Sequence, residues 1–281
     1  MQENLASPSN VRRLIREIGL RPGKSMGQNF LVDGNILRII LASADLQSQD
    51  RILEVGPGLG VVTTALLERC SHVLAVEKDR KLYEFLRASI GDDQRLELLH
   101  ADALDLDISA ILAGGIDKFV SNLPYSVASR ILVEVFRSES KPETIAVTLQ
   151  KDVAERICAV PGSGEYGLLA ILAQLYYELR IAKEIGANCF LPRPRIGSAL
   201  LVGRLRKSPL SPIEDEEFFL RVVKMSFTHR RKMIVNALRG AGFGLEETVR
   251  ALCAVGIDER LRPAQIDIAD WCRLSNALRP R

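Results

Sequence analysis

The chain has 281 residues, of which 47% are hydrophobic, so it can bury the core of one large domain and a smaller one. Lys and Arg number 38 against 35 Asp and Glu, and the formal charge of +3 gives no argument for nucleic acid from the chain as a whole. The five cysteines are scattered without a C-x-x-C pair, which excludes a zinc ribbon, predicts no metal, and is typical of the reducing cytoplasm.

The N-terminal region contains an amphipathic segment at 11–20 that carries three arginines. We expect a first surface helix here, and an organelle transit peptide is the alternative. The next apolar stretch, 31–44, is interrupted by Asp33 and Arg38 and is far too short to span a membrane. We therefore expect no membrane association.

From Arg51 onward, short β-branched runs alternate with longer amphipathic stretches, which indicates a parallel sheet with crossover helices. Strands are predicted at 51–55, 72–77, 95–100, 118–122 and 144–150, and helices at 61–70, 80–90 and 127–137. The predicted fold class is α/β, a doubly wound, Rossmann-like domain. Ligands of such domains bind beyond the carboxyl ends of the strands.

The second half of the chain changes character at a Ser- and Pro-rich stretch, 208–212, which is typical of a linker. Before it, three apolar runs are predicted to complete the sheet, with room for an antiparallel edge strand: 168–177, 179–185 and 198–205. After it, four helical segments are predicted: 214–226, 230–239, 245–255 and 268–278. We expect a Rossmann-like domain over 1–207 and a smaller all-helical domain over 208–281.

A glycine-rich loop, Glu54 to Gly60, joins the first predicted strand to a predicted helix, and Glu77 ends the next strand about 20 residues later. Glycines allow close approach of a ligand, and an acidic side chain here can accept hydrogen bonds from ribose hydroxyls. The loop reads G-x-G-x-G with Pro57 inside it, which suits a pyrophosphate poorly. The pattern favours S-adenosylmethionine over a dinucleotide, with a nicotinamide-dependent oxidoreductase as the rival class.

Two further segments follow the third and fourth predicted strands. Asp102, beside Ala103, is placed to accept a hydrogen bond from the amine of a cofactor adenine, although a solvated loop aspartate is the simpler alternative. The fourth strand is followed by the segment Asn122-Leu123-Pro124-Tyr125. The Asn122 side-chain oxygen and the Leu123 carbonyl can accept both hydrogens of an adenine amine and favour a pyramidal, more nucleophilic nitrogen.

In the same segment, Pro124 stiffens the turn and Tyr125 can stack on a base that has left its helix. The alternative for this segment is an Asx-type turn closed by a core tyrosine. The resulting hypothesis is methyl transfer to an amino nitrogen of adenine.

These segments together resemble the ribosomal RNA adenine N6,N6-dimethyltransferases. The resemblance rests on the four segments above and on three more, Lys24 to Leu31, Phe190 to Pro194, and Phe227 to Lys232, so it covers nearly the whole chain. It implies that Asn29 and Leu31 line the methionine end of the cofactor, and that Phe190 forms a sandwich with Tyr125 around the flipped adenine. A core phenylalanine is the alternative for Phe190.

The predicted site residues follow from the motifs and the resemblance together. The cofactor-binding set is Gln28, Asn29, Leu31, Gly56, Gly58, Glu77, Asp102, Ala103 and Asn122. The catalytic set is Asn122, Leu123, Pro124, Tyr125 and Phe190. One departure from the family pattern is the stretch 195–197, Arg-Ile-Gly, where an acidic residue is usual, so the contacts of this stretch are left open.

A basic patch in the second half is the predicted RNA contact. Residues 204–262 hold 12 Lys or Arg against 8 Asp or Glu, an excess of 12 − 8 = +4, and Arg230, Arg231 and Lys232 at a predicted helix start are its densest part. Such cations neutralise phosphates, although each can equally belong to a solvated helix face.

The resemblance implies dimethylation of two adjacent adenosines in the terminal hairpin of small-subunit rRNA. The expected partner is small-subunit rRNA or a pre-30S particle, and the protein is expected to be a monomer. Two alternatives remain, a large-subunit rRNA methylase of the antibiotic-resistance type and a non-catalytic assembly factor. The segment Phe227 to Lys232 and the helical tail favour the small-subunit enzyme.

Overall fold

A computed structural model describes residues 5–20 and 27–280, which form two compact units. The first unit contains the chain up to Ala154 together with Arg180–Leu205, and the second contains Glu155–Leu179 together with the chain from Arg206 onward. This grouping differs from the predicted division at 207/208. Residues 155–179 lie in the second unit because their apolar side chains share a core with the C-terminal helices.

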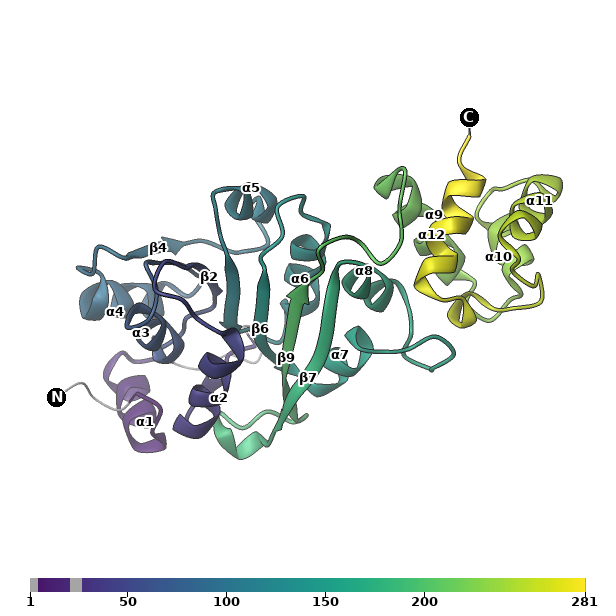
Figure 1. Ribbon diagram of the computed structural model, residues 1–281. Coiled ribbons are helices and arrows are strands. Elements are labelled where there is room, and N and C mark those ends of the chain that lie inside the picture. Colours follow the sequence, from purple (N-terminus) through teal and green to yellow (C-terminus); the bar gives the residue numbers. More distant parts are fainter. Residues whose placement is uncertain (1–4, 21–26, 281) are drawn as a thin grey trace. The chain divides into compact units, whose positions relative to one another are not determined.

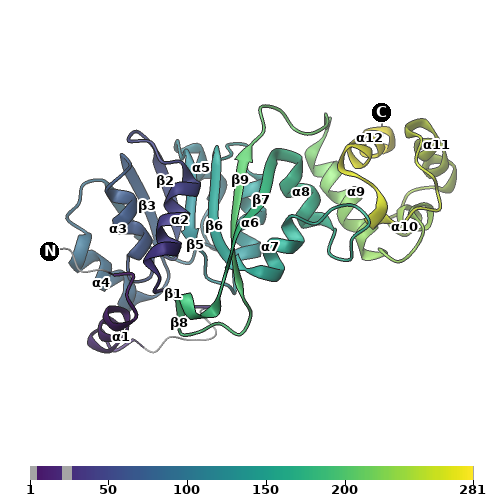
Figure 2. The same ribbon diagram turned by 60° about the horizontal axis from the view of Figure 1, so that its bottom comes forward.

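The first unit is built around a seven-stranded sheet of order β4-β3-β2-β5-β6-β9-β7 (Figures 1 and 2). Its strands are β2 (Arg51–Val55), β3 (His72–Glu77), β4 (Leu96–His100), β5 (Lys118–Asn122), β6 (Thr144–Gln150), β7 (Tyr177–Ile185) and β9 (Ser198–Leu205). The strands β4, β3, β2, β5 and β6 run parallel to one another, whereas β9 is antiparallel to β6. The strand order reverses between β2 and β5, the place where doubly wound folds bind ligands.

Helices cover both faces of this sheet. On one face, α2 (Gly34–Ala44), α3 (Val61–Leu67) and the end of α4 (Arg80–Ile90) share a core with the sheet. The alternate strand residues, such as Leu53 and Phe119, are buried toward the other face, where α5 (Ile108–Ala113) and α6 (Ala128–Arg137) lie (Figure 1). Asp33 and Asp79 start α2 and α4 by accepting hydrogen bonds from their first backbone N–H groups.

A small second sheet connects distant parts of the first unit. The two-residue strands β1 (Phe30–Leu31) and β8 (Phe190–Leu191) pair antiparallel (Figure 2). Helix α1 (Pro8–Glu17) contributes Val11 and Leu14 to a satellite core that contains Phe30 and Leu82. The sequence predicted the helix but not this pairing, because a two-residue strand leaves no periodic signal.

The second unit is helical and has its own core. It contains α8 (Leu168–Tyr176), α9 (Glu216–Thr228), α10 (Ile234–Gly240), α11 (Leu245–Val255) and α12 (Ile268–Leu278), and begins within α7 (Lys151–Ile157). The core centres on the fully buried Trp271, whose ring lies 5.9 Å from that of Phe227.

Two expectations for this region were wrong. The run 168–177 is mainly a helix and not a strand, because an apolar run buried all round has no period that separates the two. The basic patch Arg230–Lys232 lies in the turn between α9 and α10 and not at a helix start, because α9 runs on to Thr228 and α10 starts only at Ile234.

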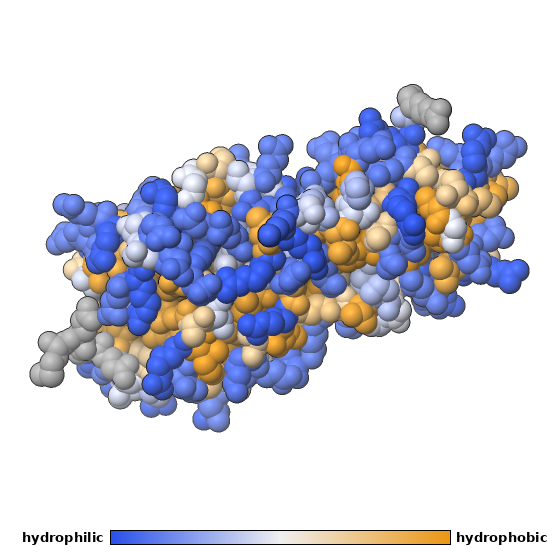
Figure 3. Space-filling model, in the orientation of Figure 1, coloured by the Kyte–Doolittle hydropathy of each residue, from blue (hydrophilic) through white to orange (hydrophobic). Residues whose placement is uncertain are grey.

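The surface drawn in Figure 3 is mostly hydrophilic, with apolar residues in separate patches. Within the described ranges, no helix combines the length and the apolar character that crossing a bilayer requires.

Candidate active site

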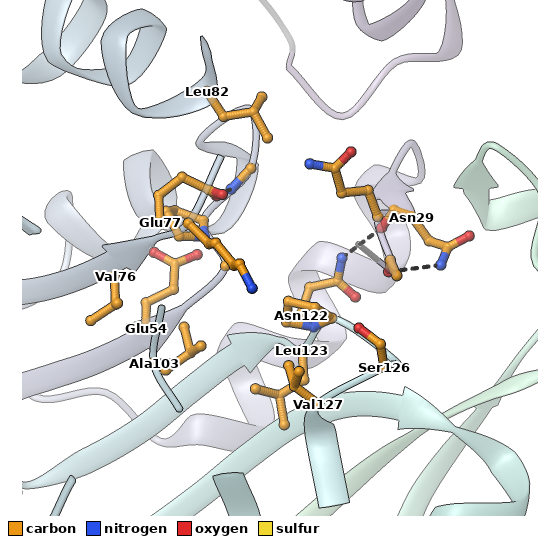
Figure 4. A pocket seen from close by; sticks show the side chains of 18 of the residues that line it. Asn29, Glu54, Val76, Glu77, Leu82, Ala103, Asn122, Leu123, Ser126 and Val127 are labelled. Carbon is orange, nitrogen blue, oxygen red and sulfur yellow. Dashed lines mark hydrogen bonds between the residues drawn. The ribbon is translucent and has the colours of Figure 1, made fainter. Parts of the chain in front are cut away.

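A cavity opens at the carboxyl ends of β2, β3, β4 and β5 (Figure 4). The loops after these four strands line it, and the segment around β1 adds Gly27 to Leu31. Every predicted cofactor-binding residue lies in this lining: Gln28, Asn29, Leu31, Gly56, Gly58, Glu77, Asp102, Ala103 and Asn122. Of the motif that begins at Lys24, residues 24–26 lie outside the described part of the chain.

The glycine loop approaches its neighbours more closely than any other residue type would allow. Gly56 has φ +74°, and a Cβ at this position would lie 2.7 Å from Cγ of Pro124. Gly58 has φ +60°, and its Cβ would lie 3.1 Å from the ring of Phe30. The loop therefore packs on the Asn122–Tyr125 turn on one side and on β1 on the other, and leaves its backbone exposed to the cavity.

Glu77 holds the loop from the next strand. One carboxylate oxygen accepts a hydrogen bond from the backbone N–H of Gly58 at 3.0 Å, and the other accepts one from Asp79 at 2.8 Å. The residue is only 5% exposed, and burial raises the pKa of Glu77 although the backbone hydrogen bonds oppose this. Each oxygen keeps a further lone pair, which a ribose hydroxyl can use.

Glu54 is a second buried carboxyl group in the same lining, and the predicted site set did not include it. It is 1% exposed, and its Oε2 has no hydrogen-bond partner among the described residues. Burial, reinforced by the nearby charge of Glu77, raises the pKa of Glu54 to about 8, although the neighbouring Thr63 hydroxyl acts to lower it. An acidic residue among the buried apolar residues Ile52, Leu53 and Val55, directly before a glycine loop, is the sequence signal that indicates such a group.

The two carboxyl groups make the cavity suitable for a cation. Figure 4 shows Glu54 and Glu77 side by side on one wall, facing Asn29 and Asn122. A buried carboxyl oxygen without a partner, such as Oε2 of Glu54, is costly unless a ligand supplies one. S-adenosylmethionine carries an ammonium and a sulfonium, and it also carries the ribose that Glu77 suits. The residues therefore fit this cofactor.

Asp102 already has partners. Its Oδ2 forms an ion pair with Nζ of Lys78 at 2.5 Å, and its Oδ1 accepts a hydrogen bond from the backbone N–H of Leu104 at 3.0 Å. The hydrogen bond from Lys78, followed by that from Leu104, lowers the pKa of Asp102. The carboxylate is thus ionised and fixed at the cavity edge. It can still accept a hydrogen bond from an adenine amine through a remaining lone pair.

Asn122 is held at both ends of its amide. Its Nδ2 donates to the backbone carbonyl of Asn29 at 2.9 Å, and its Oδ1 accepts a hydrogen bond from the Thr148 hydroxyl. The backbone N–H of Leu123 donates to the Thr148 carbonyl at 3.0 Å. Thr148 was missing from the predicted site, because the strand register that places it beside Asn122 is visible only in the fold.

The two predicted aromatic walls lie side by side but do not form a parallel sandwich. The rings of Tyr125 and Phe190 are 6.5 Å apart at an angle of 75°, and Phe190 is only 1% exposed. The Tyr125 hydroxyl is hydrogen-bonded to the hydroxyl of the buried Ser198. A base stacked on Tyr125 would therefore meet Phe190 at a steep angle, not face to face.

The predicted RNA-contacting cations belong to the second unit and are exposed. Arg230 donates a hydrogen bond to the Gly164 carbonyl at 2.6 Å. Arg231 and Lys232 form no ion pair with any residue that the structure describes. These two side chains are free to contact phosphate.

Comparison with known proteins agrees with this arrangement. A family model described as "Ribosomal RNA adenine dimethylase" matches residues 20–279. A protein from Moorella thermoacetica named "Ribosomal RNA small subunit methyltransferase A" is 36% identical over 98% of this chain and 99% of its own length. A protein of the same name from Syntrophotalea carbinolica is 37% identical over 92% of this chain and 98% of its own length.

Solved structures share the fold. A dimethyladenosine transferase from Plasmodium falciparum superposes with a TM-score of 0.74 at 20% identity, over 87% of this chain and 95% of its own. The 23S rRNA methyltransferase ErmE superposes with a TM-score of 0.66 at 25% identity, over 89% of this chain and 99% of its own. The chain belongs to the ribosomal RNA adenine dimethylase family.

Proposed function

We propose that this protein transfers methyl groups from S-adenosylmethionine to N6 of two adjacent adenosines in the terminal hairpin of small-subunit rRNA, and adds two methyl groups to each. The family supports adenine dimethylation, and the full-length relatives named as small-subunit enzymes support the choice of subunit. The observation that carries the chemistry is the fixed Asn122 amide at the edge of a cavity that contains two buried carboxyl groups.

The cofactor supplies an activated methyl group when bound, so the protein's own work is to position the acceptor. In the first transfer, the Asn122 Oδ1 and the Leu123 carbonyl accept the two amine hydrogens of the target adenine. These hydrogen bonds strengthen as the nitrogen becomes positive, and therefore lower the barrier to transfer. No protein base is required, because the ammonium product is acidic enough to lose its proton to water.

Tyr125 holds the extruded base by stacking. Its hydroxyl is anchored to Ser198, which prevents the ring from swinging away from the cavity edge. Phe190 supports the ring of Tyr125 edge-on. Substrate choice then depends on an RNA loop whose bases can leave the helical stack.

The helical unit contributes RNA affinity in this proposal. Arg231 and Lys232 neutralise phosphates without reading sequence, and Arg230 steadies the neighbouring 160–167 loop through Gly164. The proposed substrate is a pre-30S particle, on which the protein acts as a monomer. The five cysteines are all unpaired, which supports a cytoplasmic location.

The test uses small ribosomal subunits that lack the modification. They are incubated with the protein and S-adenosylmethionine. The rRNA is then digested and its nucleosides are analysed by mass spectrometry. We expect N6,N6-dimethyladenosine at two adjacent positions near the 3′ end. Modification of large-subunit rRNA alone would contradict the proposal, and so would a single methyl group per site after complete reaction.

A further inference from the structure

Thr148 lies beside Asn122 in the sheet, although the two residues are 26 positions apart. Strands β5 and β6 are parallel and in register here, with Asn122 opposite Thr148, so both side chains point to the same face. Thr148 is fully buried near the carboxyl end of β6. Its carbonyl accepts the hydrogen bond of the Leu123 N–H, so Thr148 contacts both residues that are proposed to bind the adenine amine, through the Asn122 Oδ1 and the Leu123 N–H.

The direction of the Asn122 amide follows from its two partners. The Asn29 carbonyl can only accept a hydrogen bond, so the Asn122 nitrogen must face it. The oxygen therefore faces Thr148, and because this oxygen can only accept, the Thr148 hydroxyl donates. A rotation of the amide by 180° would place two acceptors against each other at Asn29 and lose that hydrogen bond, while Nδ2 could still donate to the Thr148 hydroxyl.

We propose that Thr148 is a positioning residue for methyl transfer, whose hydroxyl fixes the Asn122 amide so that a lone pair of Oδ1 is directed at the target amine. This inference rests on the proposed function. Removal of the hydroxyl leaves Oδ1 without its donor, so the Asn29 carbonyl alone holds the amide and the amide can tilt. Misplaced acceptors act on the transition state, so the turnover number falls while binding of cofactor and RNA changes little.

The test compares two substitutions that differ only in the hydroxyl group. Thr148→Val replaces the hydroxyl by a methyl group of similar size, whereas Thr148→Ser keeps the hydroxyl. We expect kcat to fall about 10-fold or more in Thr148→Val, with KM for small subunits and the dissociation constant of S-adenosylmethionine within about threefold of the wild type. Thr148→Ser should retain kcat within about threefold.

A matched control separates the hydroxyl's role from the effect of a buried Thr-to-Val change. Thr248 in α11 is also fully buried, and its hydroxyl has no hydrogen-bond partner among the described residues, so Thr248→Val should keep full turnover. Should Thr148→Val fail to fold, Thr148→Ala measured against Thr148→Ser replaces it.

Each result has one meaning. Wild-type turnover in Thr148→Val overturns the inference, and so does a loss in Thr148→Ser equal to that in Thr148→Val. A wild-type protein that transfers no methyl group to adenosine overturns the proposed function, and the inference with it.

Discussion

At the scale of single residues, the site depends on polar groups that have hydrogen-bond partners within the protein itself. Asn122 has a partner at each end of its amide, and Glu77 accepts two backbone hydrogen bonds. Such groups need no reorganisation when the reaction begins. Glu54 differs, because its buried Oε2 has no partner in the described part of the chain.

The Asn122→Ala substitution tests the first of these groups. The variant lacks the oxygen that accepts the amine hydrogen, so we expect kcat to fall by about 100-fold or more. Affinity for S-adenosylmethionine should only weaken, because Glu77 and the glycine loop are untouched. Single-turnover methyl transfer and calorimetric titration measure the two quantities, and an unchanged kcat would refute the role of Asn122.

Glu54 should make the stability of the free protein depend on pH. Its pKa is raised from 4.5 to about 8 by burial, so its contribution to stability is fully present below pH 4.5 and is lost as the pH rises through 8. Each pH unit within this window costs up to about 1.4 kcal/mol. Glu54→Gln has no such group, so the Tm of the wild type relative to this variant should fall between pH 5.5 and 8.5.

The melting temperatures of both proteins are measured without cofactor, across the same buffers. A difference in Tm that stays constant over this range would show that Glu54 is already ionised in the folded protein. The assigned effect of burial on its pKa would then be wrong.

At the scale of elements, the site is formed by residues at the carboxyl ends of the strands and in the loops that follow them. The sequence predicted β2, β3, β5 and β6 with their observed bounds, because each is a short β-branched run between clear turn residues. It also placed the glycine loop and the Asn122 turn at the correct edge of the sheet. Their mutual contact, in which Gly56 lies against Pro124, arises from the strand order and was not predictable from spacing.

The same limit explains the residues that the sequence analysis missed. Thr148 and Ser198 come from β6 and β9, which carry no recognised motif, and they reach the site only through strand register. Phe190 was predicted, but its place beside Tyr125 likewise depends on a distant pairing, that of β1 with β8. Local patterns report local structure, whereas these contacts join residues far apart in the chain.

The Gly56→Ala substitution tests the contact between the loop and the turn. Both Gly56 and Gly162 have a positive φ, so replacement of either should destabilise the protein by about 1–2 kcal/mol. Only at Gly56 does the added Cβ meet a neighbour, Pro124, whereas nothing lies within 4 Å at Gly162. We expect cofactor affinity to fall about 10-fold or more in Gly56→Ala and to stay unchanged in Gly162→Ala.

Calorimetric titration and thermal melting of the two variants separate these effects. Equal cofactor affinity in both variants would contradict the idea that the close approach of Gly56 to Pro124 shapes the cavity.

At the scale of the whole molecule, the chain combines a cofactor-binding unit with a helical unit that has its own core. The sequence predicted two domains divided at 207/208, whereas the later passage between the two compact units lies at Leu205/Arg206. The assignment of 155–179 could not be predicted, because whether an apolar helix packs on the sheet or on other helices depends on partners that the sequence does not name.

The exposed pair Arg231 and Lys232 should contribute to RNA binding by charge alone. Loss of two phosphate contacts in Arg231→Gln/Lys232→Gln should weaken binding of rRNA and reduce the slope of log K against log salt by about 1.4 to 1.8. Cofactor affinity should not change. Arg273→Gln is a suitable control, since Arg273 is an exposed cation of the same unit that is paired with Asp270. Identical salt slopes in the wild type and the double variant would contradict this role.

The most direct test of the account is a crystal structure of the protein with S-adenosylmethionine. We expect the ribose at Glu77, the adenine at Asp102, and the sulfonium methyl directed at the corner formed by Asn122 and Leu123. A cofactor bound outside this cavity, or one whose methyl group faces away from Asn122, would contradict the proposed methyl transfer.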